Sequence, residues 1–194
     1  MAGTTTKLMG SFIKYQDPKE FRKFLKLTKK DIIFAEQVHK NSISVVTKDD
    51  RGNTVKKVDG LITKDHNLYL VIFTADCIPL FFYDWVNRII GLTHAGKMGS
   101  LMNISGNTVK GMQKLGAQVK YIKVHLGPHI CKKCYQLDLA KINIIQLIEN
   151  GVLRENITTS RFCTYEDENI FYSYRREKPA TTLFNEMLSF IALK

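Results

Sequence analysis

Residues 68–95 decide the fold, and they read LYLVIFTADCIPLFFYDWVNRIIGLTHA. The first part, Leu68 to Thr74, is an almost uninterrupted apolar run, which is typical of a strand buried on both faces. Two further runs of apolar, β-branched and aromatic residues, Ile78 to Tyr83 and Arg88 to Thr93, flank the polar-ended link 84–87. A four-residue link between two such runs predicts a β-hairpin.

The link also predicts which residues face each other across the hairpin. If Tyr83 lies opposite Arg88, counting outward pairs Phe81 with Ile90, Pro79 with Leu92, and Cys77 with His94. Side chains that face each other in this way have Cβ atoms about 5 Å apart, close enough to share an ion. The hairpin therefore predicts a thiolate and an imidazole side by side on one face of the sheet.

The rest of the chain alternates between helix-like and strand-like patterns. Apolar spacing and capping signals predict helices from Asp17-Pro18 to Lys29-Lys30, Leu101 to Leu115, Asp138 to Asn150 and Leu183 to Leu193. Apolar runs predict strands at Ile32 to Val38, Ser42 to Thr47, Tyr121 to Leu126 and near Ile170 to Tyr174, with a short element at Val58 to Thr63 and a loop at Gly96 to Gly99. The mixture of hairpins and crossovers favours an α+β fold with mixed sheets.

Length and composition limit the domain count and the compartment. The chain has 194 residues, 44% of them apolar, and no Pro-, Gly- or Ser-rich stretch divides it. We therefore expect one domain over residues 1–194. Residues 1–7 lack an apolar signal core, and Asp76 interrupts the longest apolar stretch, so we expect a cytoplasmic protein with no membrane association.

The charge is strongly positive. The sequence contains 29 Lys and Arg against 18 Asp and Glu, a formal charge of +11, which can attract polyanions or a phosphorylated substrate. The lysines are scattered and no aromatic nucleic-acid motif accompanies them, so we expect no specific nucleic-acid partner. The four cysteines, without an export signal, are interpreted as thiols or ligands rather than as a disulfide framework.

Three residues of metal-binding types stand in well-defined local motifs. His39 follows Gln37-Val38, Cys77 follows Asp76, and His94 precedes Ala95-Gly96. A zinc ion bound by three protein ligands keeps a fourth position open for water or substrate, as catalytic sites do. The alternative is a buried strand cysteine with two loop histidines, and spacing alone does not decide between the two.

Other polar residues carry weaker signals. Cys131 and Cys134 have CxxC spacing, but no second CxxC or Cys/His pair accompanies them, so the sequence does not predict a separate structural zinc site. His129 follows Gly127-Pro128 and could act as a fourth ligand or proton carrier, or be a histidine at the edge of the core. Asp59 precedes Gly60, and we expect its carboxylate to shape a turn by accepting hydrogen bonds from backbone amides.

Seven blocks of sequence extend through most of the chain. They are Gln37-Val38-His39, Val58 to Thr63, Thr74 to Leu80, His94-Ala95-Gly96, Gly127 to Ile130 with Cys134-Tyr135, Cys163-Thr164, and Phe171 to Arg176. Taken in this order they resemble the YfiH/laccase-like family, once called multicopper polyphenol oxidases and now described as purine nucleoside phosphorylases with adenosine deaminase activity. The resemblance implies a β-sandwich of mixed sheets flanked by helices, with zinc, or copper in older descriptions, held by His39, Cys77 and His94.

One block departs from the family pattern. The usual His-Ala-Gly-Trp-Arg-Gly is here His94-Ala95-Gly96-Lys97-Met98-Gly99, so an aromatic ring and a guanidinium are both missing. Lys97 can attract phosphate but cannot make the planar bidentate contact of an arginine. Either the substrate preference has changed in this member or its activity has been lost.

The resemblance implies a nucleoside and phosphate as substrates, with His39, Cys77 and His94 as the catalytic centre. In phosphorolysis, phosphate attacks C1′ of the ribose as the purine leaves, so the protein must position the anion and stabilise the leaving base. Candidate substrate-binding residues are Lys97, Arg175, Arg176, Asp76 and His129. In deamination, Asp76 beside Cys77 is the nearest carboxylate that could carry a proton, although it could instead accept a backbone hydrogen bond.

Two alternatives stand beside the phosphorylase. Cys77 could be the nucleophile of a metal-independent cysteine-type hydrolase with His94 as its base. A catalytically drifted member could instead be a binding protein that recruits anionic partners through its positive surface. The sequence does not predict the oligomeric state or the preferred nucleoside.

Overall fold

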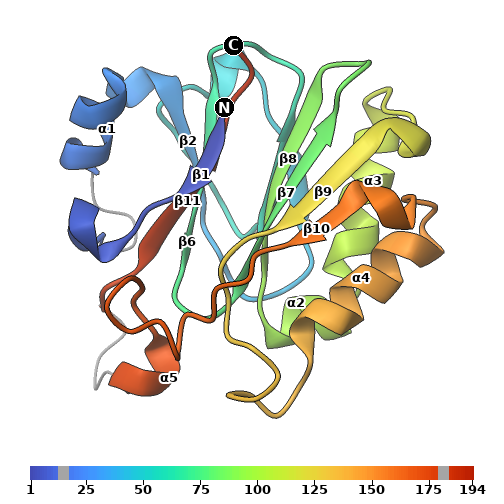
Figure 1. The fold of residues 1–194 in the computed structure, drawn as a ribbon. Coiled ribbons are helices and arrows are strands. Elements are labelled where there is room, and N and C mark those ends of the chain that lie inside the picture. Colours follow the sequence, from blue (N-terminus) through green and yellow to red (C-terminus); the bar gives the residue numbers. More distant parts are fainter. Residues whose placement is uncertain (13–17, 179–183) are drawn as a thin grey trace.

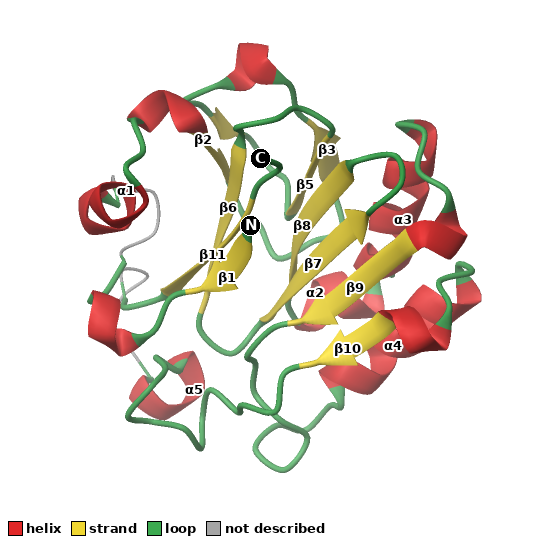
Figure 2. Cartoon of the chain, turned by 45° about the horizontal axis from the view of Figure 1, so that its top comes forward, coloured by secondary structure: helices red, strands yellow, loops and turns green. Residues whose placement is uncertain are grey.

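The computed structural model describes residues 1–12, 18–178 and 184–194. The strands form two mixed sheets that face each other, and helices cover the outer faces (Figures 1 and 2). This arrangement confirms the α+β sandwich of mixed sheets flanked by helices. Within the described ranges, no helix is both long enough and apolar enough to cross a membrane.

The first sheet is built around the apolar run that begins at Leu68. Its strand order is β1 (Ala2–Thr4), β11 (Met187–Ile191), β6 (Tyr69–Thr74), β2 (Ile32–Ala35) and β4 (Thr54–Val55). Strand β6 pairs antiparallel with β11 and parallel with β2, and all its residues are buried, which confirms the prediction of a strand covered on both faces. Helix α1 (Lys19–Leu25) covers the outer face through Phe21.

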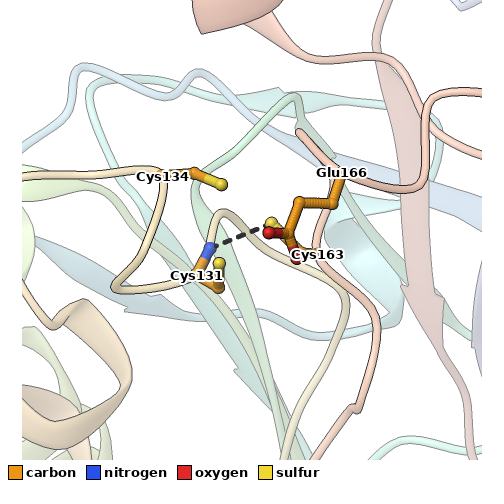
Figure 3. A group of neighbouring side chains, drawn as sticks. All are labelled: Cys131, Cys134, Cys163 and Glu166. Atoms are coloured by element: carbon orange, nitrogen blue, oxygen red, sulfur yellow. Dashed lines mark hydrogen bonds between the residues drawn. The ribbon is translucent and has the colours of Figure 1, made fainter.

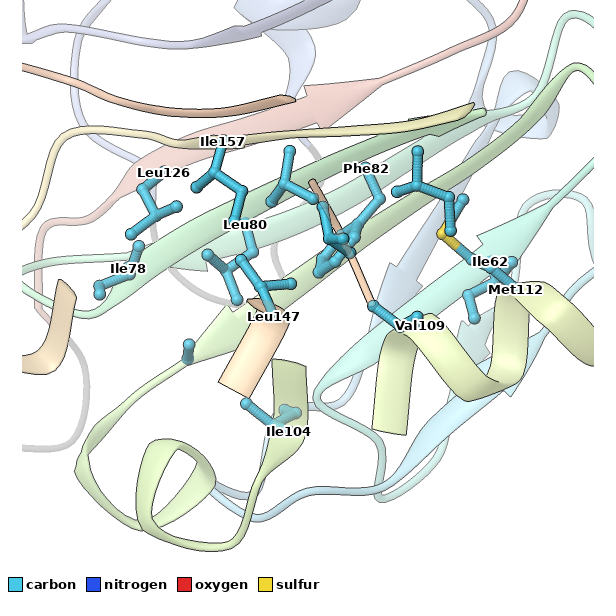
Figure 4. Close-up of a cluster of buried hydrophobic side chains, with 14 of the residues drawn as sticks. Ile62, Ile78, Leu80, Phe82, Ile104, Val109, Met112, Leu126, Leu147 and Ile157 are labelled. Carbon is cyan, nitrogen blue, oxygen red and sulfur yellow. The ribbon is translucent and has the colours of Figure 1, made fainter. Parts of the chain in front are cut away.

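The second sheet contains the predicted hairpin. Its strand order is β10 (Ile157–Thr159), β9 (Ile122–Leu126), β7 (Ile78–Asp84), β8 (Ile89–Ala95), β5 (Gly60–Thr63) and β3 (Ile43–Val45). Two helices, α3 (Ile104–Lys114) and α4 (Leu139–Glu149), cover its outer face, and Leu80 and Phe82 of β7 belong to the same buried cluster as their apolar residues (Figure 4). The other α-helices of the described residues are two short ones, α2 (Lys97–Leu101) and α5 (Tyr174–Glu177).

The space between the sheets is filled by the side chains that point inward. Leu70 and Ile72 of β6 belong to the same buried cluster as Phe81 of β7 and Leu92 of β8. Burial of each such side chain contributes about 1.5–3 kcal/mol. Because successive residues of a strand point to opposite faces, β6 and β7 each supply one row to this central core and another to the helix-covered outer core.

The predicted hairpin is present, but the predicted register is wrong by two residues. Tyr83 pairs with Ile90, and His94 pairs with Pro79 rather than with Cys77. A shift of two residues keeps every side chain on its expected face. Cys77 therefore lies just before the strand and not within the ladder.

The cause of the shift is Asp84. Its buried carboxylate accepts hydrogen bonds from the amides of Val86 at 3.0 Å and Asn87 at 2.9 Å, and from the amide of Gln118 at 2.8 Å. These hydrogen bonds place the turn after Asp84, so β7 extends through Asp84. The loop begins one residue later than predicted and ends at Arg88, whose φ of 56° lies in the left-handed region.

The end of the chain forms a strand where the sequence predicted a helix from Leu183 to Leu193. Leu183 itself lies outside the described residues, but β11 occupies 187–191 between β1 and β6. Its residues pair with two neighbours and are largely buried, so tertiary pairing outweighs the helical propensity of Met and Leu.

Three shorter predictions also need correction. The predicted strand near Ile170 to Tyr174 is irregular backbone that leads into α5, where the Ser173 side chain accepts a hydrogen bond from the Arg176 amide. The predicted loop 96–99 already enters α2 at Lys97. Helix α1 ends at Leu25 because the next residue adopts the left-handed conformation, and its predicted start at Asp17 lies outside the described residues.

Candidate active site

The structure brings His39, Cys77 and His94 together, although the hairpin does not pair the last two. Their ring nitrogens and sulfur all lie within 4.8 Å of one another. His39 lies in the turn after β2, Cys77 lies immediately before β7, and His94 lies in β8. His94 is buried, Cys77 is partly buried and His39 is exposed, so the group is open to solvent on the His39 side.

Asp59 organises this group. Its fully buried carboxylate accepts a hydrogen bond from His94 Nδ1 at 2.9 Å and from the amides of Val38, His39 and Lys40 at 3.2, 2.9 and 2.9 Å. The contacts with the amides confirm the turn-forming role expected for Asp59. The contact with His94 was missed, because it joins residues 35 positions apart. The buried carboxylate holds a proton on Nδ1, so Nε2 of His94 is the nitrogen that an ion would bind after displacing its proton.

Backbone geometry keeps room at the site. His39 and Asp76 have φ values of 58° and 90°, a region that non-glycine residues seldom adopt and that is enriched at functional positions. Gly96 has no side chain to intrude, and a Cβ there would lie 3.0 Å from Cys77 Sγ and 3.4 Å from Cδ2 of His39. The chain therefore leaves a space where the three side chains meet.

The site favours charge separation between sulfur and imidazole. Burial alone would raise the pKa of the Cys77 thiol, but the positive charge of His94 and hydrogen bonds with both histidines lower it to about 6. Burial alone would lower the pKa of His94, but the Cys77 thiolate and the Asp59 carboxylate raise it to about 9. Near neutral pH, without a metal, the pair is a thiolate and an imidazolium.

One thiolate and two imidazoles are donors that suit zinc and copper. The donor atoms lie close enough together to share one ion, Asp59 fixes the tautomer of His94, and Gly96 leaves the space open. With three protein donors, such an ion would keep a coordination position for water or substrate. These observations fit the metal that the family resemblance implies.

The Asp76 side chain is hydrogen-bonded to two segments that are distant in sequence. Its Oδ1 accepts a hydrogen bond from the Thr164 hydroxyl at 2.7 Å, and its Oδ2 accepts from the Ser173 hydroxyl at 3.0 Å and the Arg175 amide at 2.7 Å. Both carboxylate oxygens are thus occupied by protein donors. Of the two roles that the sequence left open for Asp76, the geometry matches the acceptor of a backbone hydrogen bond.

The two arginines differ in their contacts. Arg176 donates to the carbonyl oxygens of Thr164, Tyr165 and Phe171 at 2.7–2.9 Å, so its guanidinium holds the loop that precedes α5. Arg175 is exposed, and its guanidinium carbon lies 5.5 Å from the centroid of the Tyr135 ring. Arg175 therefore keeps hydrogen-bond donors that face solvent beside the Asp76 segment.

Lys97 and His129 occupy different environments. Lys97 is exposed at the start of α2, directly after Gly96, so its ammonium group is attached next to the open space of the site. His129 is buried, its Nδ1 donates to the Gly127 carbonyl at 2.8 Å, and burial lowers its pKa. The group formed by His39, Cys77 and His94 does not include His129.

A pocket of about 540 Å³ lies elsewhere, between the chain ends and strands β7 and β9. Its lining includes Phe81, Tyr83 and His125 but none of the three clustered residues. The group formed by His39, Cys77 and His94 is therefore open to solvent and is not part of this pocket.

Comparison with known proteins identifies similar sequences. The chain is 33% identical over 199 residues to the purine nucleoside phosphorylase YlmD of Bacillus subtilis (strain 168), an alignment that covers 84% of this chain and 70% of the relative. It is 32% identical over 197 residues to the purine nucleoside phosphorylase YlmD of Geobacillus stearothermophilus, covering 82% and 71%. The similarity thus extends over most of both chains.

Solved structures share the fold. The crystal structure of YlmD from Geobacillus stearothermophilus superposes with a TM-score of 0.91 at 28% identity, covering 100% of this chain and 92% of that one. The hypothetical protein YfiH of Bacillus licheniformis gives a TM-score of 0.90 at 28% identity with the same coverage. The model of the family described as multi-copper polyphenol oxidoreductase laccase matches residues 16–138 and 135–194. The chain therefore belongs to this family, the YfiH/laccase-like family that its sequence resembles.

Proposed function

We propose that this chain is a zinc-dependent purine nucleoside phosphorylase that acts on adenosine or inosine, with adenosine deamination as a side activity. The observation that carries the proposal is the convergence of His39, Cys77 and His94 in a chain whose relatives are named purine nucleoside phosphorylases. Copper is the alternative metal for the same donors. Methylthioadenosine is a further candidate substrate of the same chemical class.

In this proposal His39, Cys77 and His94 would hold the ion. The bound ion would supply a Lewis acid that polarises a substrate atom placed at its open position. The residues around it have separate tasks. Asp59 orients the His94 ring through Nδ1, and Gly96 keeps the approach to the sulfur clear.

The reaction breaks the bond between ribose C1′ and the purine nitrogen while a phosphate oxygen forms a new bond to C1′. The purine leaves with the bonding electrons and takes up a proton, and ribose 1-phosphate remains. The protein must therefore hold a phosphate anion next to the sugar. Lys97 and Arg175 are exposed cations attached beside Gly96 and Asp76, and we assign them to the phosphate.

The remaining candidates take positioning roles in the proposal. Both oxygens of Asp76 already accept protein hydrogen bonds, so Asp76 would hold the Cys77 and Arg175 segments rather than touch the nucleoside. Arg176 would hold the loop that carries Arg175, because its guanidinium is bound to three carbonyl groups of that region. His129, buried and bound to a backbone carbonyl, would support the neighbouring loop.

One observation favours a second function. The lowered pKa of Cys77 and the raised pKa of His94 describe a thiolate and imidazolium pair, which is the charge state of cysteine hydrolases. In that function Cys77 would attack the substrate and His94 would protonate the leaving group. Phosphate dependence separates the two functions, because phosphorolysis consumes phosphate whereas hydrolysis requires only water.

The decisive experiment measures purine release from adenosine and inosine with and without phosphate, together with elemental analysis of the purified protein. We expect base and ribose 1-phosphate only when phosphate is present, and loss of both after His39→Ala. His66→Ala is the matched control, because His66 is also an exposed histidine outside the helices. Phosphate-independent, chelator-resistant hydrolysis would favour the cysteine hydrolase. Metal-loaded protein inert toward nucleosides would favour the drifted binding protein.

A further inference from the structure

A second group of metal-binding side chains lies outside the site described above. The sulfur atoms of Cys131, Cys134 and Cys163 and a carboxylate oxygen of Glu166 all lie within 4.8 Å of one another. Figure 3 shows the four side chains gathered around a common centre. Three thiols and a carboxylate at this spacing are not needed for packing, since Cys131, Cys134 and Glu166 are not fully buried.

Two loops distant in sequence bring these residues together. Cys131 and Cys134 lie in the loop after β9, and Cys163 and Glu166 lie in the loop after β10. The two loops are joined by a backbone bridge between His129 and Cys163, with the Thr164 amide donating to the His129 carbonyl at 3.1 Å. The second loop therefore supplies Cys163 and Glu166, the two further metal-binding residues that the sequence near the CxxC pair does not contain.

The backbone around the cluster is arranged to support anionic sulfur. The Cys131 amide donates a hydrogen bond to Cys163 Sγ at 3.3 Å. The Cys134 amide also approaches the Cys131 carbonyl at 3.0 Å, which closes the CxxC turn. Hydrogen bonds from amides to sulfur orient and stabilise thiolate ligands in metal sites.

We propose that Cys131, Cys134, Cys163 and Glu166 form a zinc site distinct from the His39, Cys77 and His94 group. A tetrahedral zinc ion with bonds of about 2.3 Å to sulfur places its ligand atoms about 3.7 Å apart, so a small contraction of the observed spacing would close the site. The carboxylate selects zinc over copper(I), which prefers soft thiolate ligands alone. Four protein donors leave no open position, so the site is structural.

Charge supports a bound cation at this place. A bound zinc ion would displace the thiol protons and would offset the repulsion among the resulting thiolates and the carboxylate at this spacing. Two lysines stand between the cysteines of the CxxC turn, and Lys133 Nζ lies 3.5 Å from Glu166 Oε1. Zinc together with the adjacent Lys132 and Lys133 balances the four negative charges.

The proposed ion would hold the first site in shape. Thr164, next to Cys163, donates its hydroxyl hydrogen to Asp76, and Ile130, next to Cys131, donates its amide hydrogen to the Asp76 carbonyl at 3.0 Å. Asp76 precedes Cys77 in the chain. An ion that holds the loops after β9 and β10 together would therefore also hold Asp76 in place. Because Asp76 precedes Cys77, it would fix the position of Cys77.

The test uses a protein in which the first site is disabled, so that its outcome does not depend on the proposed activity. We expect purified Cys77→Ser protein to retain one zinc ion per chain by elemental analysis. Adding Cys134→Ser should remove that ion, whereas adding Lys132→Ala, in the same turn but without a ligand atom, should leave it bound. Absence of zinc from Cys77→Ser protein would overturn the proposal, as would a Cys131–Cys134 disulfide detected by mass spectrometry.

A spectroscopic measurement avoids the risk that Cys134→Ser fails to fold. Cobalt added to metal-stripped Cys77→Ser protein should give a sulfur-to-cobalt charge-transfer band with the intensity of three thiolates in a tetrahedral site. Zinc should then displace the cobalt. A band with the intensity of one thiolate, or displacement by copper(I) but not by zinc, would contradict the assignment.

Discussion

The two clusters of metal-binding side chains differ in donors, burial and support. The first combines one sulfur with two imidazoles, one of which is fixed by the buried Asp59 carboxylate. The second combines three sulfurs with one carboxylate, and the Cys131 amide donates a hydrogen bond to the Cys163 sulfur. Three donors leave room for a substrate, whereas four close the coordination sphere. In the two proposed assignments, the first cluster binds a substrate through its metal and the second cluster holds two loops together.

The clusters are also connected. Asp76 lies beside Cys77 in the chain and accepts the Thr164 hydroxyl hydrogen bond from the loop of the second cluster. Its φ of 90° costs about 1–3 kcal/mol for a residue other than glycine, so its surroundings must hold it in place. Thr164, which donates to Asp76, directly follows Cys163 of the second cluster.

The largest effect should come from the first cluster. Cys77→Ser removes the only sulfur of the group of three, and we expect purine release to fall below detection while the circular dichroism spectrum stays native. Cys134→Ser changes the second cluster and leaves His39, Cys77 and His94 intact. The fraction of this variant that folds should therefore retain measurable turnover. Equal residual activities in the two variants would remove the distinction between reacting and holding sites.

The two clusters should also differ in thiol reactivity when metal is removed. Interaction with His94 lowers the Cys77 pKa to about 6, whereas burial, a hydrogen bond with Cys131 and the charge of Cys163 raise the Cys134 pKa to about 12. At pH 7 about 90% of Cys77 is then thiolate and almost none of Cys134. Iodoacetamide should label Cys77 first, by peptide mass spectrometry.

The rate at which iodoacetamide labels Cys77 should depend on pH, because its pKa is about 6. As the pH falls through about 6, Cys77 gains its proton and its labelling rate should decrease about tenfold per unit. Labelling of protein unfolded in urea is the control, because both thiols then have ordinary pKa values and should react alike. Native Cys77 and Cys134 that react at equal rates at pH 7 would contradict the predicted charge pair.

The sequence predicted the first cluster better than the second for physical reasons. His39 and Cys77 lie beside apolar strands and His94 lies near the end of one, and hydrophobic burial fixes where such strands end. The predicted pairing of Cys77 with His94 was nevertheless wrong, because Asp84 moved the turn by accepting amides that only the folded loop presents. The residues still met, since they come from adjacent strand ends rather than from facing positions.

Features that depend on contacts between distant segments were not predicted. Strand β11 has the composition of a helix, and only its neighbours in the sheet make it extended. Cys163 lies 29 residues after Cys134, and no local pattern relates them, because a backbone bridge from His129 brings them together. Asp59 was predicted as a turn former, and its second contact, with His94, required the sheet to form first.

A smaller effect on metal binding should follow from changing Asp59, which orients His94 but supplies no metal-binding atom. Asp59→Asn keeps the shape and one acceptor oxygen but removes the charge that holds the imidazole. We expect zinc affinity at the first cluster to fall about 10–100-fold in a chelator competition titration, and the second cluster to be unaffected. Glu36→Gln is the matched control, since Glu36 also accepts a backbone amide hydrogen bond but lies near the surface. Unchanged affinity would show that His94 needs no partner.

The smallest effect should come from the link between the clusters. Thr164→Val removes the hydroxyl that donates to buried Asp76 at 2.7 Å and leaves one carboxylate oxygen without that donor. We expect the free energy of unfolding in urea to fall by about 1–3 kcal/mol, because a buried acceptor loses its partner. Thr158→Val, whose hydroxyl contacts exposed His125, should change it by less than about 0.5 kcal/mol. Equal changes in the two variants would mean that Thr164 does not secure Asp76, and the clusters would then act independently.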